Sequence, residues 1–380
     1  MMSRKLIWLI LLIALLIRLP SLFKPHIEND EIIFQTLTVK VAKTRSLRDY
    51  TLKGEEILEK LPASLYDTVL FQHPPGFVVA SSLVYILSGD NVRAMLLVPV
   101  LGALVSVFCV YWIGKILNSE QVGLMSAMIL AVEPVLLFSS TRFLIDGLLT
   151  GLVSLAMLFF VRAIKFSKWR DWLWCGFFTA IAILTKYPAI LLLPIMLGSW
   201  LVSSKKKLRA KNLLSFIFPL ILLVGGWWSY YYHVTGLIFP LVGKPTQELI
   251  DNFPFMKMVV NRPMYYYFKQ LLITSPLVSL GLVLAVYSWI KNRQATIELL
   301  WAGMFIVGLT GFGILKGGYQ MRYIAMAMPG LALLAGQQQW LKTYLSQTVL
   351  LFGIVIGFVT GLLNAYAYLV ADVFSIFELF

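Results

Sequence analysis

Residues 77–87 read FVVASSLVYIL and directly follow the motif His73-Pro74-Pro75-Gly76. The segment is apolar, but it is far shorter than the roughly 20 residues that a helix needs to cross the hydrocarbon core of a bilayer. We therefore expect a short helix that turns back or lies at the membrane surface. The two prolines constrain the start of this helix and hold His73 beside it. Whether the segment crosses decides on which side of the membrane every later loop lies.

The composition is that of a polytopic membrane protein. Of the 380 residues, 59% are hydrophobic and 13% are charged, and the mean hydropathy is +0.82. Soluble domains carry about 25% charged residues, so this chain has too few to cover a water-soluble globule, and its hydrophobicity excludes disorder. The net charge of +14 comes from short basic clusters between apolar stretches. That pattern is typical of cytoplasmic loops and not of a nucleic-acid-binding face.

Eleven apolar stretches predict spanning helices. We expect an all-α polytopic membrane protein that forms one integral membrane domain over residues 1–380, with the short helix at 77–87 in addition. Two long external loops are predicted, residues 24–75 with juxtamembrane helices and residues 233–269 between two aromatic clusters. Such clusters are common interfacial anchors, and stacking on a sugar or bordering a lipid groove is the alternative. The predicted spans are 6–23, 94–113, 122–138, 147–163, 172–185, 188–202, 213–232, 271–290, 298–315, 324–341 and 347–371.

The distribution of Lys and Arg selects the topology. If residues 77–87 cross the membrane, the basic cluster Lys205–Lys211 becomes external; if they do not cross, the basic loops all fall inside, as the positive-inside rule requires. Residues 6–23 lack the small-residue cleavage pattern of a signal peptide, so we interpret them as an uncleaved first span. The prediction is eleven spans with the N-terminus inside and the C-terminus outside.

In this topology the ionisable residues that would be costly within a bilayer gather at its outer face. Placing them around one water-accessible cavity removes much of that cost. This grouping is a reason, independent of any motif, to expect a functional site there. The residues are Asp30, Glu31, His73, Arg93, Arg142, Asp146, Lys186, Lys316 and Arg322.

The acidic residues have alternative interpretations. Asp30 and Glu31 are adjacent carboxylates soon after the first span, and such a pair suits a general base or a metal ligand; a solvated acidic pair is the alternative. Arg142 and Asp146 stand four residues apart and would pair with each other on one helix. Alternatively, Arg142 faces a phosphate and Asp146 orients it or a substrate hydroxyl. The sequence leaves both interpretations open.

Two further cationic residues, Lys186 and Arg322, are candidates for the same site. Lys186 lies between two short predicted spans, where snorkelling to the interface is the alternative role. Arg322 follows Lys316-Gly317-Gly318; glycines allow close backbone approach, and arginine offers a bidentate fork to phosphate oxygens. An arginine that merely anchors a glycine-rich turn is the alternative there. The sequence has no P-loop, dinucleotide-binding fingerprint, HExxH or GxSxG motif, so no nucleotide site is visible.

In order and spacing, these residues resemble the class C membrane glycosyltransferases. The most similar branch contains the protein O-mannosyltransferases, the lipid A aminoarabinose transferase and the rhizobial-type glycosyltransferases. The resemblance covers about residues 1 to 335. It rests on Asp30-Glu31, Gln72-His73-Pro74-Pro75, Arg93, Pro134 with Arg142 and Asp146, Thr185-Lys186-Tyr187, Thr235-Gly236 with Pro240, and Arg322-Tyr323 with Pro329.

The resemblance implies transfer of a sugar, with inversion, from a polyprenyl-phosphate donor to a hydroxyl of a lipid, glycan or protein at the outer membrane face. It implies a catalytic group of Asp30, Glu31 and Asp146 and a donor-phosphate group of His73, Arg142, Lys186 and Arg322. Relatives differ in their use of divalent metal, so Asp30 and Glu31 are candidate ligands and no cofactor is assigned. The resemblance does not extend to the family's large soluble C-terminal domains, so it implies no particular acceptor.

Two other functions compete with this one. A polytopic transporter or lipid flippase would favour inverted repeats and charges at the membrane midplane; the sequence has no visible repeat, and its charges within spans, Arg18 and Glu133, lie near span ends. A non-catalytic scaffold would leave the external cluster of acids and bases unexplained. The expected location is a prokaryotic plasma membrane with the site facing outside. The expected partners are the lipid-linked donor, the acceptor and membrane lipids, without nucleic acid.

Overall fold

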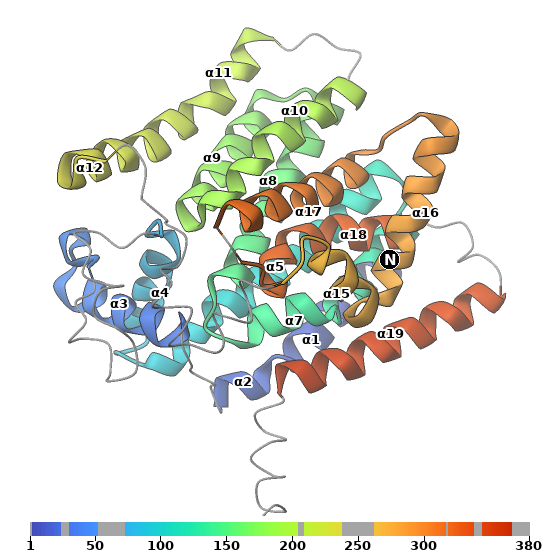
Figure 1. The fold of residues 1–380 in the computed structure, drawn as a ribbon, viewed down its shortest axis with the longest axis horizontal. Coiled ribbons are helices and arrows are strands. Elements are labelled where there is room, and N and C mark those ends of the chain that lie inside the picture. Colours follow the sequence, from blue (N-terminus) through green and yellow to red (C-terminus); the bar gives the residue numbers. More distant parts are fainter. Residues whose placement is uncertain are drawn as a thin grey trace, which may run out of the picture.

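The computed structural model describes residues 2–23, 30–51, 73–203, 209–237, 262–316, 318–337 and 344–366, which are mainly helical (Figure 1). The α-helices in chain order are α1 (Met2–Leu16), α2 (Leu19–Phe23), α3 (Asp30–Thr44), α4 (Gly76–Leu87), α5 (Leu97–Leu117), α6 (Glu120–Ala131), α7 (Pro134–Thr141), α8 (Ile145–Phe166), α9 (Trp169–Thr185), α10 (Leu192–Ser203), α11 (Ala210–Pro219), α12 (Gly226–Thr235), α15 (Tyr266–Thr274), α16 (Pro276–Asn292), α17 (Ile297–Lys316), α18 (Met328–Gly336) and α19 (Tyr344–Ala365). Short 3-10 helices are η1 (Leu47–Asp49), η4 (Val92–Leu96), η5 (Tyr187–Leu191) and η7 (Met321–Ala327), and η6 (Leu220–Gly225) is a π-helix.

The chain is an integral membrane protein. Among the described residues, five helical segments are long and apolar enough to cross a membrane, and the bent pair of α6 and α7 would make a sixth. The predicted stretches coincide mainly with helices wherever they are described, but several of those helices are short or interrupted. The eleven spans and the internal N-terminus therefore stay predictions. The five segments are residues 5–23, 92–117, 145–166, 210–235 and 297–314.

The segment that decides the topology forms α4, a helix of 12 residues. At 1.5 Å per residue it is about 18 Å long, well short of a hydrocarbon core of roughly 30 Å. α4 packs against α3, and the Ser82 hydroxyl donates a hydrogen bond to the Thr38 carbonyl at 3.0 Å (Figure 1). At its start, a Cβ on Gly76 would lie 2.6 Å from the carbonyl oxygen of Leu184. This close approach brings the start of α4 to the end of α9.

The helices α5 and α8 form a close backbone contact that positions the site. A Cβ on Gly102 would lie 2.5 Å from the Gly147 carbonyl oxygen, and one on Gly151 would lie 2.4 Å from the Gly102 carbonyl oxygen. Small residues let helix backbones approach closely within membranes. One turn further, the Ser106 and Ser154 hydroxyls are 2.8 Å apart. The glycine contact therefore holds the first turn of α8, which carries Asp146.

The predicted span 122–138 is a broken helix. α6 and α7 meet at an angle of 55°, and Pro134 opens α7 while Glu133 caps it, which is the usual use of proline at a first helical position. α7 ends at Thr141, and Arg142 is extended before α8 begins at Ile145. Arg142 and Asp146 therefore do not share a helix. The interpretation that they pair within one helix is wrong, because the chain changes direction between them.

We predict that replacing Gly102 with alanine destabilises the α5–α8 contact. The added methyl group has no room beside the backbone of α8, so we expect a loss of about 1–3 kcal/mol, measured by thermal unfolding in detergent. The control is Gly303→Ala on α17, where nothing lies within 4 Å of the added Cβ. That variant should be neutral or slightly stabilised, and equal losses from the two variants would contradict the packing argument.

Candidate active site

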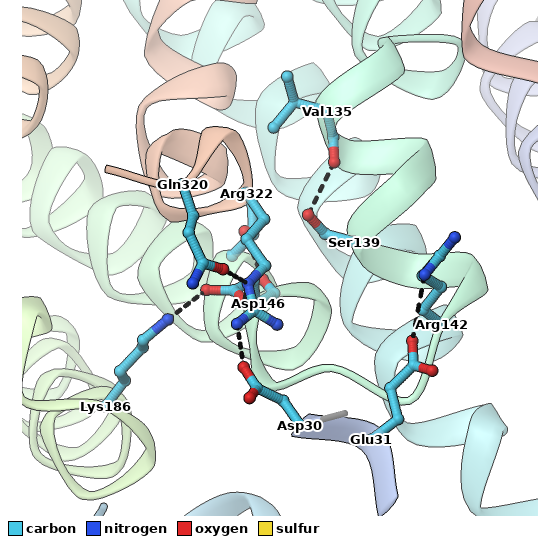
Figure 2. A network of polar contacts seen from close by, with 10 residues as sticks. Asp30, Glu31, Val135, Ser139, Arg142, Asp146, Lys186, Gln320 and Arg322 are labelled. Atoms are coloured by element: carbon cyan, nitrogen blue, oxygen red, sulfur yellow. Dashed lines mark hydrogen bonds and ion pairs between the residues drawn. The ribbon is translucent and has the colours of Figure 1, made fainter. Parts of the chain in front are cut away.

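Arg322 links two carboxylates from different parts of the chain. Its Nη2 donates a hydrogen bond to Oδ2 of Asp30, in the first turn of α3, and its Nε lies 3.9 Å from Oδ2 of Asp146 (Figure 2). The Arg322 Nε also donates to the side-chain oxygen of Gln320 at 2.8 Å. The guanidinium therefore brings Asp30 and Asp146 into one cluster, although they are 116 positions apart in the sequence.

Lys186 forms a third ion pair in this cluster. Its Nζ lies 2.7 Å from Oδ1 of Asp146 and sits over the ring of Tyr323, 4.2 Å from the ring centre. Lys186 is only 8% exposed and Asp146 only 2%. Snorkelling of Lys186 towards solvent is therefore not what the structure shows. Its position follows from the end of α9, where Lys186 takes an extended conformation between α9 and η5.

Arg142 and Glu31 form a looser contact on the other side of the cluster. Their Nη1 and Oε1 atoms are 4.0 Å apart (Figure 2). The guanidinium also lies 4.6 Å from the ring centre of Phe138. The buried Nε of Arg142 has no hydrogen-bond acceptor among the described residues. Its donor capacity is therefore only partly used, as expected of a side chain that receives an anionic ligand.

The electrostatics of Asp30 follow from this arrangement. Burial by itself would raise its pKa, but the Arg322 guanidinium, with His73 and Lys186 acting more weakly, holds the pKa below its ordinary value. The carboxylate is thus ionised at neutral pH, while its side chain remains 46% exposed. His73 lies at the start of α4 with its ring 6.0 Å from that of Phe34. An exposed, ionised carboxylate can accept a proton or a hydrogen bond from a bound molecule.

A pocket of about 480 Å³ opens beside the cluster, a volume within the range of small-molecule sites. Its lining combines charged and apolar side chains, and one of its walls comes from Arg262 and α15. This wall was missed by the sequence analysis, which weighed only the aromatic residues of that region. The lining residues are Asp30, Glu31, Pro134, Val135, Phe138, Arg142, Leu144, Arg262, Tyr266, Gln270, Thr274, Gln320, Met321 and Arg322.

Arg262 is the main addition to the predicted site. Its Nη1 donates to the Tyr319 carbonyl at 2.7 Å, and its guanidinium lies 4.5 Å from the ring centre of Tyr266. Arg262 therefore has further donors available for the pocket. The only signal for Arg262 in the sequence is its position near the end of a long predicted loop, next to an aromatic cluster. Nothing in that pattern distinguishes a ligand-binding arginine from an interfacial one.

The members of the aromatic cluster at the start of α15 lie in different environments. Tyr265 and Phe268 are exposed, Tyr267 is fully buried against Tyr319, and Tyr266 lines the pocket. The exposed members suit the anchor interpretation and Tyr266 suits the stacking interpretation, and both interpretations stay predictions. The helical repeat separates these residues, because neighbouring residues point about 100° apart around the axis.

Other sequence-derived candidates lie apart from the site or outside the described residues. Arg93 is exposed at the start of η4. The side chain of Lys316, together with Gly317 and Gln72, falls outside the part of the chain that the structure describes. Within the described ranges, no three His, Cys, Asp or Glu side chains are grouped so that they could hold a metal ion. The two candidate ligands, Asp30 and Glu31, instead face Arg322 and Arg142.

The chain is similar to a known protein family and to several solved structures. Residues 72–230, less than half of the chain, match the family model described as dolichyl-phosphate-mannose-protein mannosyltransferase. The solved structure of ArnT from Cupriavidus metallidurans bound to undecaprenyl phosphate is similar, with a TM-score of 0.70 and 15% identity over 92% of this chain and 62% of that one. The chain has the class C membrane glycosyltransferase fold. The resemblance inferred from the sequence is thereby confirmed.

Further structures share the class C fold. The oligosaccharyltransferase AglB from Archaeoglobus fulgidus, in complex with an inhibitory peptide and a dolichol-phosphate, gives a TM-score of 0.61 at 13% identity, covering 95% of this chain and 56% of that one. The arabinofuranosyltransferase AftD from Mycobacteria gives 0.56 at 13% identity, covering 96% and 26%. This chain thus spans less than two thirds of the length of these proteins. A search of the curated proteins found no match.

We predict a strong energetic coupling between Lys186 and Asp146. Removing one partner of a buried ion pair leaves an uncompensated charge, so Lys186→Met should destabilise the protein by about 3–5 kcal/mol. The double variant Lys186→Met with Asp146→Asn should recover part of that loss, because neither charge is then left alone. A double-mutant cycle on thermal unfolding measures the coupling, and simple additivity of the two substitutions would contradict a direct pair.

Proposed function

We propose that the protein is a glycosyltransferase that moves a sugar from a polyprenyl-phosphate donor to a hydroxyl acceptor, with inversion at the anomeric carbon. The observation that carries the proposal is the meeting of Asp30, Asp146 and Arg322 beside a pocket that also exposes Arg142 and Arg262. A transferase of this kind needs an ionised carboxylate for the acceptor hydroxyl and cations for a phosphate leaving group, and it needs them on either side of one cavity.

In the proposed reaction, the acceptor oxygen attacks the anomeric carbon from the face opposite the phosphate. The new bond joins the acceptor oxygen to that carbon, the bond from the carbon to the phosphate oxygen breaks, and the electron pair leaves with the polyprenyl phosphate. Asp30 accepts the hydroxyl proton or orients the hydroxyl, with Glu31 and Asp146 assisting. Asp146 assists by holding Arg322 and Lys186 in place.

The leaving phosphate gains negative charge as the bond breaks. Fixed cations at that point lower the barrier, because they need not reorganise during the reaction. We assign this role to Arg142, Lys186 and Arg322, with His73 near the same phosphate, and we add Arg262 because it lines the pocket. ArnT and AglB, whose fold this chain shares, have been solved with undecaprenyl phosphate and dolichol-phosphate respectively. The lipid-linked donor class is inferred from those complexes and from the cations on this chain.

We further propose that residues 1–380 form one membrane domain of eleven spans with the N-terminus inside and the site at the outer face of a prokaryotic plasma membrane. In this arrangement the loops at 24–75 and 233–269 are external. The positive-inside rule supports this topology, and the shortness of α4 is consistent with it. Cysteine labelling in intact cells tests it: a cysteine at Asp90 should react with an impermeant reagent, and one at Arg293 should not.

We predict that the purified protein consumes at least one sugar in a panel of polyprenyl-phosphate donors, and that Asp30→Asn lowers the transfer rate by about 10²–10⁴-fold, the usual contribution of a positioned base. The matched control is Asp90→Asn, which removes an exposed carboxylate at a residue with φ of +63°; asparagine tolerates that conformation. Normal transfer by Asp30→Asn, or uptake and flipping of lipid in liposomes without donor turnover, would reject the proposal.

We predict that the rate falls on acidification as Asp30 takes up a proton, because only the ionised carboxylate accepts the hydroxyl proton. Arg322 lowers the pKa of Asp30, so the wild-type loss should occur below the ordinary pH range of a carboxyl group. Removing the charge in Arg322→Gln should raise that pKa and move the acid limb of the kcat/KM profile to higher pH. Arg322→Lys keeps the charge and should move it less. An acid limb that is identical in Arg322→Gln and wild type would contradict the coupling.

A further inference from the structure

Two buried charged residues lie outside the proposed chemistry. Arg18, between α1 and α2, is fully buried, and Glu133, between α6 and α7, is 2% exposed. Charged side chains at membrane depth are costly, so their retention indicates a specific role. Arg18 donates from Nε to the Ser140 hydroxyl at 2.7 Å and from Nη1 to the Ala131 carbonyl at 3.1 Å. It therefore bridges the end of α6 and the end of α7 across the break between these helices.

Glu133 connects this break to a second one. Its Oε2 accepts a hydrogen bond from the backbone N–H of Leu136 at 2.7 Å, which caps α7. Its Oε1 accepts from the Ser275 hydroxyl at 2.6 Å. Ser275 is the single residue between α15 and α16. One carboxylate thus ties the start of α7 to the junction of α15 and α16, two segments that are 142 residues apart.

The two tied segments both contribute to the pocket lining. Pro134, Val135 and Phe138 come from α7, while Tyr266, Gln270 and Thr274 come from α15. Glu133 immediately precedes the first group, and Ser275 immediately follows the second. The hydrogen bond between Glu133 and Ser275 therefore lies at the start of the α7 part of the lining and at the end of the α15 part. α7 also leads directly into Arg142, whose guanidinium faces the pocket.

We propose that Glu133 and Ser275 are positioning residues whose hydrogen bond sets the separation of the α7 and α15 walls of the substrate pocket. Arg18 supports them by holding the α6–α7 break and by offsetting the charge of Glu133. The bond acts on the pocket without touching the substrate. The inference rests on the proposed function for its kinetic readout, but the wall separation itself can be measured without any turnover.

The structural test compares two serines of one helix junction. Ser275→Ala removes the bond to Glu133, and Ser275→Thr retains a hydroxyl. The control Ser279→Ala removes a buried hydroxyl one turn later that donates only to the Ser275 carbonyl in the described structure. Spin labels on cysteines at Lys269 of α15 and Leu101 of α5, both exposed, report the wall separation, because α5 packs against α7. Buried Cys109 and Cys175 are replaced by alanine in this background.

We expect the distance distribution to lengthen or broaden in Ser275→Ala and to stay unchanged in Ser279→Ala and Ser275→Thr. An unchanged distribution in Ser275→Ala overturns the proposal whether or not the protein turns over a donor. Absence of turnover in the wild type, with a shifted distribution in Ser275→Ala, rejects the proposed function but leaves the wall separation assigned to this bond.

The kinetic test uses the same variants with the donor that the wild type consumes. A misplacement of about 1 Å between reacting groups can cost on the order of 10²-fold in rate, so we expect kcat for Ser275→Ala to fall by about 10–100-fold, with recovery in Ser275→Thr. Ser279→Ala should keep the wild-type kcat even if its thermal unfolding midpoint falls as far as that of Ser275→Ala. Equal kinetic losses in the two alanine variants would reduce the role of Ser275 to general stability and overturn the proposal.

Discussion

The contact of Arg322 with Asp30 and Asp146 is the interaction on which the candidate site depends. It joins α3, η7 and the start of α8, three elements that hydropathy alone would not place together. Burying a charge without a partner is costly, so these groups are stable in the apolar body only as a set in which each charge is compensated. The need for compensation also explains the other contacts: Lys186 compensates the charge of Asp146. The exposed part of the Asp30 carboxylate lines the pocket.

A cluster held in this way is suited to chemistry at a phosphate. Its cations Arg322 and Lys186 are largely buried and held by carboxylates before any ligand binds, so a developing negative charge meets cations that need no rearrangement. Arg142 and Arg262 extend the positive surface along the pocket. The carboxylates of Asp30, Glu31 and Asp146 compensate part of this positive charge, which explains why acids and bases occur together around one cavity.

Close packing and interrupted helices position these side chains together. The glycines between α5 and α8 hold the first turn of α8, and the 55° break between α6 and α7 directs α7 towards the pocket. Both features place residues in the pocket lining, since Val135 and Phe138 come from α7 and Leu144 directly precedes α8. Broken helices are tolerated in membranes when side chains satisfy the freed backbone groups, and Arg18 and Glu133 do so here.

The sequence by itself determined the membrane character, the helical class and the shortness of residues 77–87. It also identified Asp30, Asp146, Lys186 and Arg322 as candidates for one site. Both were possible because the length of an apolar stretch and a charge next to it are local properties of the chain. The partners of these residues were decided only by the tertiary structure. It separated Arg142 from Asp146, added Arg262 and Gln270 to the pocket, and joined Glu133 to Ser275. The physical reason is that an ion pair or a hydrogen bond within 3 to 4 Å depends on how helices pack, and packing between distant segments leaves no periodic trace in the sequence.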